Sequence, residues 1–341
     1  MRETTGYRGI FVLFLMIAGL ILLSCARQKT ANLNPKISLV NSPTDILTKG
    51  AEFLSGKIRE FSHEEMHPKV YHSGVLSGGK GTAEIEMCQQ GSIEIHITTT
   101  AYLANMVPKT SVFSLPFLFR NVDQVVELVK SHSPVLDSIN RDLEKKRLKV
   151  IAWWPRGFRQ LTNSKRPVET LEDMKGLVIR VMNNQLYVDN LNAMGANPVP
   201  MAWGEVYNAL QLHTIDGQEN SEVVIYDAKL YEAQKYLTVW DYSTDIEVVL
   251  VNIRWWNRLT GVQRAAIQKA ADASVDYEVK LLKKTTRDLR QQLKKKGMKI
   301  NYLTPAAKAE YKKAVVPVWE KYEQVFTKPF FEAFIKEVEK Y

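Results

Sequence analysis

A single arginine, Arg180, interrupts an otherwise apolar run at residues 177–182. Gly176 precedes the run and two asparagines follow it, a pattern typical of a short strand buried on both faces. A guanidinium group keeps its proton and is costly to bury without an anion beside it. The strand alone leaves two interpretations open. Arg180 either pairs with a carboxylate elsewhere in the fold or lines a cavity that receives an anion from outside.

The N-terminus has the features of an export signal. Arg2 and Arg8 precede an uncharged run at residues 10–23. This run is short for a membrane span but has the length of a signal-peptide core. We therefore expect a periplasmic or extracytoplasmic protein with residues 1–24 as its signal peptide. An ordinary secretion signal and a retained membrane anchor are the alternatives to the lipoprotein signal described next.

A small residue and a cysteine, Ser24 and Cys25, end the apolar run. This ending resembles the lipobox of bacterial lipoproteins, in which the cysteine becomes the lipidated first residue. It predicts a membrane-anchored lipoprotein with a lipid on Cys25, followed by a polar tether over residues 25–35. Cys88 is then the only thiol left, so no intramolecular disulfide can form, and we expect Cys88 to be buried.

The sequence offers no recognisable catalytic or metal-binding pattern. We find no zinc-type spacing of cysteine and histidine, no P-loop, no dinucleotide glycine pattern and no nucleophile elbow. The glycine-rich residues 78–81 lack the P-loop spacing and predict a turn before a helix. We therefore expect a protein that is not an enzyme and that uses no cofactor and no metal ion.

Length and charge limit the remaining functions. After the signal peptide about 316 residues remain, more than one core usually supports, so two lobes are expected. Much of the net charge of +9 lies at residues 280–299, where apolar residues recur at helical spacing and predict a solvated basic helix face. Nucleic-acid binding is not expected, because aromatic residues are not interleaved with these charges. Attraction to an anionic membrane surface or to a partner protein stays open.

Strands and helices alternate in both halves of the chain, which predicts an α/β architecture with parallel sheets. In such sheets a ligand binds beyond the carboxyl ends of the strands, here facing the other lobe. Residues 93–98 alternate apolar and polar side chains and predict a strand with one polar face. The long helix after Val262 is expected to return to the first lobe and cross the hinge. The predicted strands are 36–40, 69–72, 93–98, 149–154, 177–182, 198–200 and 237–251 (one strand or two), and the predicted helices are 43–61, 122–129, 185–194, 204–212, 261–295 and 305–341.

Six segments carry further motifs, at residues 115–119, 157–167, 172–182, 194–207, 215–220 and 231–237. Together and in this order they resemble the solute-binding proteins of TRAP (tripartite ATP-independent periplasmic) transporters, the DctP family. The resemblance runs from about residue 35 to about residue 320. It implies a two-lobed clamshell, like that of periplasmic binding proteins, with long C-terminal helices. Such a receptor captures a small organic acid and delivers it to the permease subunits of a sodium-driven transporter.

The resemblance also divides the chain. We expect lobe I to comprise residues 36–155 and 246–285. Lobe II is expected to comprise residues 156–245 and about 286–341, with the hinge-crossing and C-terminal helices. A ligand sensor or signalling receptor of the same fold is the alternative function.

In this family the arginine of the strand at residues 177–182 holds the ligand carboxylate, which implies that role for Arg180. A planar guanidinium can hold a carboxylate through two parallel hydrogen bonds, whereas a lysine cannot. Arg159, in the segment Gly157-Phe158-Arg159, is a second candidate anion contact. Asn220 matches an asparagine whose amide contacts the ligand. Trp203 matches an aromatic residue that packs on the ligand's carbon frame.

Residues from other segments complete the predicted site. Thr99 and Tyr102 belong to the part of the first lobe that faces the cleft. Glu219 is expected to support Asn220 or Arg180, or to be a surface charge. The polar residues 98–100 fit a ligand with hydroxyl groups, or are simply the β-branched end of a strand. Sialic-acid receptors of the family carry acidic residues there, so an amino sugar acid is not expected.

Two positions depart from the family pattern. Pro155 and Arg156 replace an Asp-Asn pair before Gly157, and Ser221 replaces the usual proline after Asn220. If Arg156 points into the cleft, it adds a positive charge and favours a ligand with two carboxylates. We favour the other orientation, in which Arg156 is a solvated hinge residue.

Overall fold

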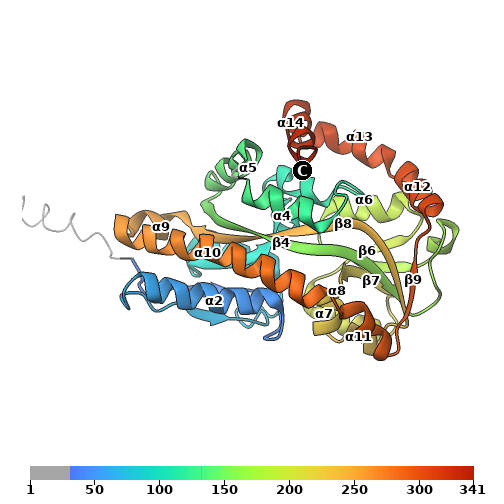
Figure 1. The fold of residues 1–341 in the computed structure, drawn as a ribbon, viewed down its shortest axis with the longest axis horizontal. Coiled ribbons are helices and arrows are strands. Elements are labelled where there is room, and N and C mark those ends of the chain that lie inside the picture. Colours follow the sequence, from blue (N-terminus) through green and yellow to red (C-terminus); the bar gives the residue numbers. More distant parts are fainter. Residues whose placement is uncertain (1–30, 132) are drawn as a thin grey trace, which may run out of the picture.

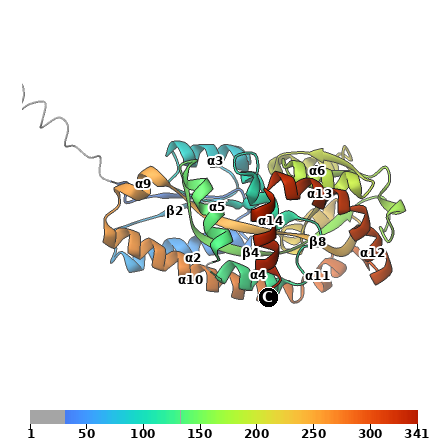
Figure 2. The same cartoon turned by 90° about the horizontal axis from the view of Figure 1, so that it is seen from above.

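The computed structural model describes residues 31–131 and 133–341. The predicted signal peptide, Cys25 and most of the predicted tether lie outside these ranges. Figures 1 and 2 show two lobes side by side, joined by long strands and by one long helix. Within the described ranges, no helix combines the length and the hydropathy needed to cross a bilayer.

A single sheet of nine strands runs through both lobes of the described chain. Its strand order is β2-β1-β3-β8-β4-β7-β5-β6, with β9 paired to β8. Strands β4 and β8, of 16 and 17 residues, pass from one lobe into the other (Figure 1). The strands are β1 Lys36–Ser38, β2 Lys69–Tyr71, β3 Ile95–Thr99, β4 Leu148–Asn163, β5 Val178–Val181, β6 Asn197–Pro200, β7 Gly217–Ser221, β8 Tyr236–Asn252 and β9 Lys299–Tyr302.

β4 and β8 form an antiparallel ladder that connects the lobes. Shifts in register interrupt it between Val150 and Ala152, between Pro155 and Phe158 and after Arg159. Extra residues at such bulges bend a strand and increase its twist. The central bulge, next to Pro155, therefore lies where the ladder turns from one lobe into the other. The lobe boundaries given above remain a prediction.

The prediction of parallel sheets is wrong for the centre of the sheet. β1 pairs in parallel with β2 and β3, and β5 pairs in parallel with β6 and β7. In contrast, β8 is antiparallel to β3 and β4, and β4 is antiparallel to β7. The reason is topological. β4 leads the chain out of lobe I and β8 leads it back, so the two strands run in opposite directions.

The hydropathy pattern also fails to predict that some polar residues are buried within strands. Strand β7 was not predicted, because Gly217–Ser221 lacks apolar residues, yet all five of its residues are buried. The predicted polar face of β3 is not solvated, since His96 and Thr98 are buried and the His96 ring lies 2.8 Å from the Ser38 hydroxyl. Polar side chains that satisfy one another inside a protein look like surface residues in the sequence.

Helices cover both faces of the sheet (Figures 1 and 2). The longest, α10, begins with a capping box in which the side chains of Thr260 and Gln263 each accept the other's backbone N–H. It packs along α2 and β4 in lobe I and continues to α8 and α11 in lobe II. The helices are α2 Ile46–Phe61, α3 Gly81–Gln90, α4 Val122–Lys130, α5 Pro134–Glu144, α6 Gln185–Ala193, α7 Trp203–Gln211, α8 Glu222–Asp227, α9 Ile253–Arg258, α10 Gly261–Thr286, α11 Leu289–Lys295, α12 Pro305–Ala314, α13 Val316–Val325 and α14 Lys328–Val338.

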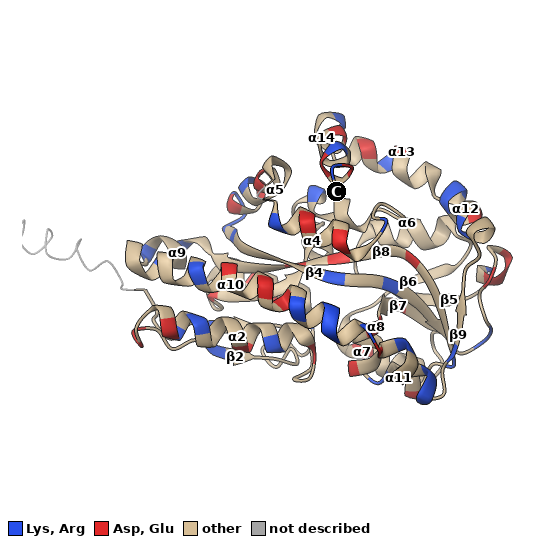
Figure 3. Cartoon of the chain, viewed as in Figure 1, with Lys and Arg blue, Asp and Glu red and all other residues tan. Residues whose placement is uncertain are grey.

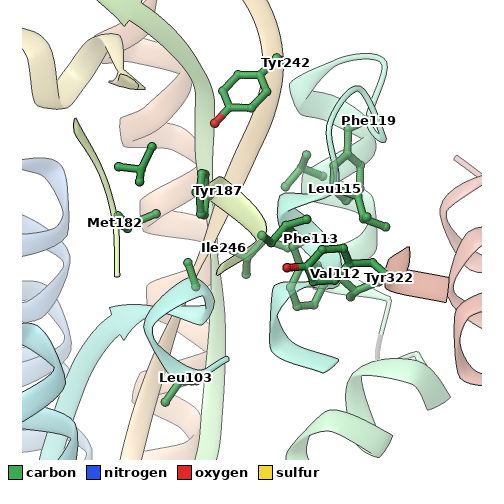
Figure 4. Close-up of a cluster of buried hydrophobic side chains, with 14 of the residues drawn as sticks. Leu103, Val112, Phe113, Leu115, Phe119, Met182, Tyr187, Tyr242, Ile246 and Tyr322 are labelled. Atoms are coloured by element: carbon green, nitrogen blue, oxygen red, sulfur yellow. The ribbon is translucent and has the colours of Figure 1, made fainter. Parts of the chain in front are cut away.

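The largest apolar core is continuous across the hinge. It includes Phe113 of lobe I, Tyr187 and Met182 of lobe II, and Ile246 of β8 between them (Figure 4). The C-terminal helices cover it, because α13 packs on α6 and α14 packs on α4 and α5. The Phe334 ring of α14 meets Phe113 edge-on, with the ring centroids 5.3 Å apart. The end of the chain thus contacts both lobes.

One carboxyl group lies unpaired between the helices of lobe I. Glu278 of α10 is fully buried, and neither of its oxygens has a hydrogen-bond partner. It faces Gly50 of α2, where an added Cβ atom would lie 1.9 Å from Oε1. Burial raises the pKa of Glu278 well above its usual value. Arg156 opposes this rise, and the carboxylates of Asp45 and Glu247 add to it.

We expect Glu278→Gln to stabilise the protein at neutral pH. The unfolded chain releases this proton above about pH 4.5, whereas the folded protein retains it up to a much higher pH. The wild type should therefore lose stability as the pH rises above about 4.5, because the folded state binds this proton more tightly than the unfolded state does. Thermal unfolding from about pH 4 to about pH 8 should give curves that coincide at acid pH and separate as the pH rises. Glu86→Gln, on the exposed side of α3, is the control, and equal curves for wild type and Glu278→Gln would contradict the assignment.

Candidate functional site

A narrow cavity of about 60 Å³ lies between the two lobes. Lobe I contributes β3 and the short 3-10 helix that follows it at Thr100–Leu103. Lobe II contributes β5, β7 and the start of α7, while β4 and β8 contribute where they cross the hinge. The lining residues are Val40, Asn41, Ile97, Thr98, Thr99, Tyr102, Arg156, Arg159, Arg180, Met182, Trp203, Asn220, Val224, Asp245 and Glu247.

Arg180 reaches this cavity with one nitrogen free. Strand β5 is paired on both edges, with β6 and β7, and the Arg180 side chain is fully buried. Its Nε and Nη2 atoms donate to the carbonyl oxygen of Met201 at 3.1 and 2.7 Å, which fixes the plane of the guanidinium. Its Nη1 atom has no hydrogen-bond partner. The sequence left two interpretations of Arg180 open. The structure shows no ion pair between Arg180 and a carboxylate of the described chain, which excludes the first.

The surroundings of Arg180 leave its charge only partly compensated. Burial lowers the pKa of Arg180, the phenol of Tyr102 opposes this, and the nearby cation of Arg159 adds to it. The guanidinium carbon lies 5.7 Å from the centroid of the Trp203 ring, at the first turn of α7. A cation that is buried beside an aromatic face and keeps a free donor is a ready contact for an anion.

Strand β7 presents Asn220 to the cavity and Glu219 to the interior. Successive side chains of a strand point to opposite faces, and only Asn220 of the two lines the cavity. The Asn220 Oδ1 atom accepts the N–H of Ser221 at 3.0 Å, which orients the amide. Glu219 is fully buried, so it is not a surface charge. Its hydrogen bonds with arginine are made to Arg159, and it acts on Arg180 only through its charge, which raises the pKa of Arg180.

Arg159 also lines the cavity, but its charge is already balanced. Its guanidinium forms ion pairs with Glu219 and Asp245, and Nη2 donates to Glu219 Oε1 at 2.9 Å. Tyr242 and Tyr187 donate to these two carboxylates at 2.9 and 2.7 Å. Burial opposes the charge, but both carboxylates raise the pKa of Arg159 well above its usual value. The contact of Arg159 with an anion stays a prediction, and this arginine does not need one.

The expectation that Arg156 is a solvated hinge residue is wrong. The side chain is 2% exposed and lines the cavity. Its Nη1 and Nη2 atoms donate to the two oxygens of Asp45 at 3.0 and 2.8 Å. Asp45 also caps α2 by accepting the N–H of Leu47 at 2.9 Å. The two hydrogen bonds to Asp45 offset the cost of burying Arg156. They also neutralise the positive charge that, if free, would have favoured a ligand with two carboxylates.

The remaining predicted residues lie on the lobe I side of the cavity. Thr99 Oγ1 caps the following 3-10 helix by accepting the N–H of Ala101 at 3.2 Å, and Tyr102 lies half-buried near Arg180. Among the charged lining residues, two were missed, Asp245 and Glu247 of β8. The signal that identified Arg180 was present there too, because both are charged residues within a buried strand.

A wider groove of about 450 Å³ lies elsewhere, between α4, α8 and α10. Figure 3 marks the Lys and Arg positions of α10 and α11 in blue. Charges of both signs line it, and Lys283 pairs with Asp123 and Arg290 with Glu222, both at 2.6 Å. The unpaired Nη1 atom of Arg180 belongs to the cleft between the lobes and not to this groove. Among the described residues, no three His, Cys, Asp or Glu side chains are grouped as a metal ion requires.

The lobes touch directly beside the cavity. Gly79, in the predicted turn that precedes α3, has a positive φ of 81° and lies against Gly204, the residue after Trp203. A Cβ atom on Gly79 would lie 3.1 Å from the Gly204 Cα atom. The Asn184 amide of lobe II also donates to the carbonyl of Ala101 in lobe I at 2.8 Å. The cleft is therefore closed.

The family model described as "Bacterial extracellular solute-binding protein, family 7" (DctP) matches residues 37–325 of the chain. The chain belongs to this family. A DctP-family relative, the 2,3-diketo-L-gulonate-binding periplasmic protein YiaO of Escherichia coli, is 29% identical over 286 residues, which cover 84% of this chain and 85% of the relative.

Solved structures of other DctP-family proteins have the same fold. A TRAP periplasmic solute-binding protein from Ralstonia eutropha, with bound (S)-2-acetolactate, has a TM-score of 0.86 and 30% identity and covers 91% of this chain and 99% of its own. The sugar acid binding protein DctPAm from Advenella mimigardefordensis, in complex with galactonate, has a TM-score of 0.86 and 28% identity over 90% of this chain and 99% of its own. The predicted family, two-lobed fold and role as a solute receptor are thereby confirmed.

Contact between Gly79 and Gly204 predicts that a larger side chain here blocks closure. In Gly204→Val the added Cβ atom already lies 3.4 Å from the Gly78 carbonyl oxygen and 3.5 Å from the Gly79 Cα atom. The two methyl groups beyond it should overpack this contact, which costs about 1–3 kcal/mol. We expect the affinity for the acid that the wild type binds most tightly to fall about tenfold or more, while thermal stability without ligand is kept.

Calorimetric titration of wild type and Gly204→Val measures this effect. Gly56→Val is the matched control, since no atom lies within 4 Å of a Cβ added to Gly56. The same affinity in wild type and Gly204→Val would show that the lobes do not meet here in the liganded state.

Proposed function

We propose that the protein captures a small organic carboxylate outside the cytoplasm and delivers it to the permease subunits of a TRAP transporter. The observation that carries this proposal is the buried Nη1 atom of Arg180, which has no partner and belongs to the lining of the cleft. An unpaired buried cation is unfavourable. It is expected where a ligand supplies the missing charge.

The geometry of Arg180 defines how a carboxylate would bind. One edge of the guanidinium, formed by Nε and Nη2, is used by the Met201 carbonyl. The other edge, formed by Nη1 and the second hydrogen of Nη2, has the spacing of a carboxylate and can form two parallel charge-assisted bonds. In this arrangement Asn220 donates its amide to the same carboxylate, and Trp203 packs against the ligand's carbon atoms.

The names of relatives support a ligand that carries hydroxyl or keto groups besides its carboxylate. YiaO is named for 2,3-diketo-L-gulonate, and the two solved relatives hold acetolactate and galactonate. The polar lining from Thr98, Thr99 and Tyr102 offers hydrogen bonds to such groups. We therefore propose a hydroxy acid or sugar acid as the ligand class.

Closure of the cleft follows from the placement of these groups. Arg180, Asn220 and Trp203 belong to lobe II, whereas Thr99 and Tyr102 belong to lobe I. A ligand contacts both sets only when the lobes are together, so it shifts the population toward the closed form. The closed form is then the state presented to the permease.

We further propose that the receptor is a lipoprotein held at the membrane through Cys25. The sequence Ser24-Cys25 after an apolar run supports this, because it resembles a lipobox. Mass spectrometry of the mature protein should find Cys25 as a lipid-modified first residue. A mature N-terminus at another residue would contradict the proposal.

Arg180→Ala tests the proposed site. Loss of one partner of a buried charge pair costs about 2–5 kcal/mol, so affinity should fall about 30-fold or more. The fold should survive, because the variant removes an unpaired buried cation rather than an ion pair. Arg180→Lys should also lose affinity, since an ammonium cannot reproduce the fork.

The measurement is calorimetric titration with a panel of hydroxy acids, together with thermal unfolding of each variant. Arg254→Ala, an exposed arginine on α9, is the control and should bind as the wild type does. Unchanged affinity in a folded Arg180→Ala variant would remove the proposed mechanism.

A further inference from the structure

Glu247, like Arg180, is an ionisable residue of the cleft that forms no ion pair within the described chain. It lies in β8, directly opposite Thr99 of β3, and is 7% exposed. Its carboxyl group lines the cavity. Arg156 and Arg159 act on it only at longer range, because their own nitrogens are engaged by Asp45 and by the other carboxylates already described.

Ion pairing leaves the cleft with one free cation. Three cationic side chains line it, Arg156, Arg159 and Arg180. The first is held by Asp45 and the second by Asp245 and Glu219. Only Arg180 lacks a carboxylate partner within the described chain. The cleft can therefore neutralise a single carboxylate on its ligand.

We propose that Glu247 is a specificity-determining residue, which restricts the ligand to acids with one carboxylate and a hydroxyl group that hydrogen-bonds to Glu247. This inference rests on the proposed function, in which Arg180 holds the carboxylate. The rest of the ligand then faces Glu247 and Asp245 of β8 and Thr99 of β3. A hydroxyl group satisfies the Glu247 carboxyl group.

A second carboxylate on the ligand fits this position poorly. It would lie near Glu247 and Asp245, and no free cation of the described chain remains to pair with it. Once Glu247 is ionised, its charge lies close to that of the second carboxylate, and like charges brought together at a desolvated site are strongly unfavourable, which is a common source of specificity. Selection against dicarboxylates therefore comes from the acidic residues of β8. The arginines of the cleft would by themselves attract a second carboxylate.

Protonation of Glu247 gives this contact a pH dependence. Burial raises the pKa of Glu247 to about 8, and Arg156 opposes the rise while Asp245 and Asp45 add to it. Arg159 faces it from β4, and Glu278 acts on it from α10. A ligand anion adds one more negative charge, so it binds better while Glu247 is protonated. Affinity for a hydroxy acid should thus fall between about pH 7 and about pH 9.

Matched pairs of acids test the proposal in calorimetric titrations. D-galactonate and galactarate, or D-erythronate and meso-tartrate, differ only in whether the terminal carbon is an alcohol or a second carboxylate. At about pH 9, where Glu247 with its pKa of about 8 is ionised, the wild type should bind the monocarboxylate of a pair roughly 100-fold more tightly, as several kcal/mol of like-charge repulsion implies. Equal or tighter binding of the dicarboxylate would overturn the proposal, whether or not any variant folds.

Glu247→Gln tests the residue itself. At about pH 9, where the wild-type carboxylate is charged and the amide is not, the variant should reduce the preference for the monocarboxylate about tenfold or more. Its affinity should also lose the decline between about pH 7 and about pH 9. An unchanged preference together with an unchanged pH profile in the folded variant would overturn the role of Glu247. If no acid binds the wild type, or if Arg180→Ala leaves binding intact, the proposed function itself fails.

Discussion

The structure depends on one buried cation that the protein leaves incompletely satisfied. Arg180 is held in place by a single carbonyl group, covered by Trp203 and left with a free Nη1 atom. A buried arginine normally has a carboxylate beside it, because desolvation of the charge is costly. Here no carboxylate of the described chain pairs with Arg180, which lies at the interface between the two lobes. In the proposed function a bound acid pairs with Arg180 and, by contacting both lobes, holds them together.

The rest of the cleft is arranged so that this cation stays the only free one. Arg159 and Arg156 are equally buried, but three carboxylates engage them from β7, β8 and the start of α2. These ion pairs tie the hinge strands β4 and β8 to both lobes. They also keep the arginines from competing for a ligand. The same side chains thus stabilise the hinge and define how much negative charge the cleft accepts.

Local pattern was sufficient for part of this arrangement. The apolar run around Arg180 predicted its strand, and the family motifs predicted six of the residues that line the cleft. The partners of Arg156 and Arg159 could not be predicted, since Asp45 and Asp245 lie 111 and 86 positions away along the chain. Strand β7 was missed because buried polar residues resemble exposed ones. Glu247 was missed although it shows the feature that identified Arg180, a charge within a buried strand.

A structure of the wild-type protein with a bound acid tests the central claim most directly. We expect a ligand carboxylate oxygen within hydrogen-bond distance of Arg180 Nη1, while Glu219 and Asp245 remain on Arg159 and Asp45 remains on Arg156. A carboxylate of the protein occupying Nη1, or a ligand whose acid group lies away from Arg180, would contradict the account.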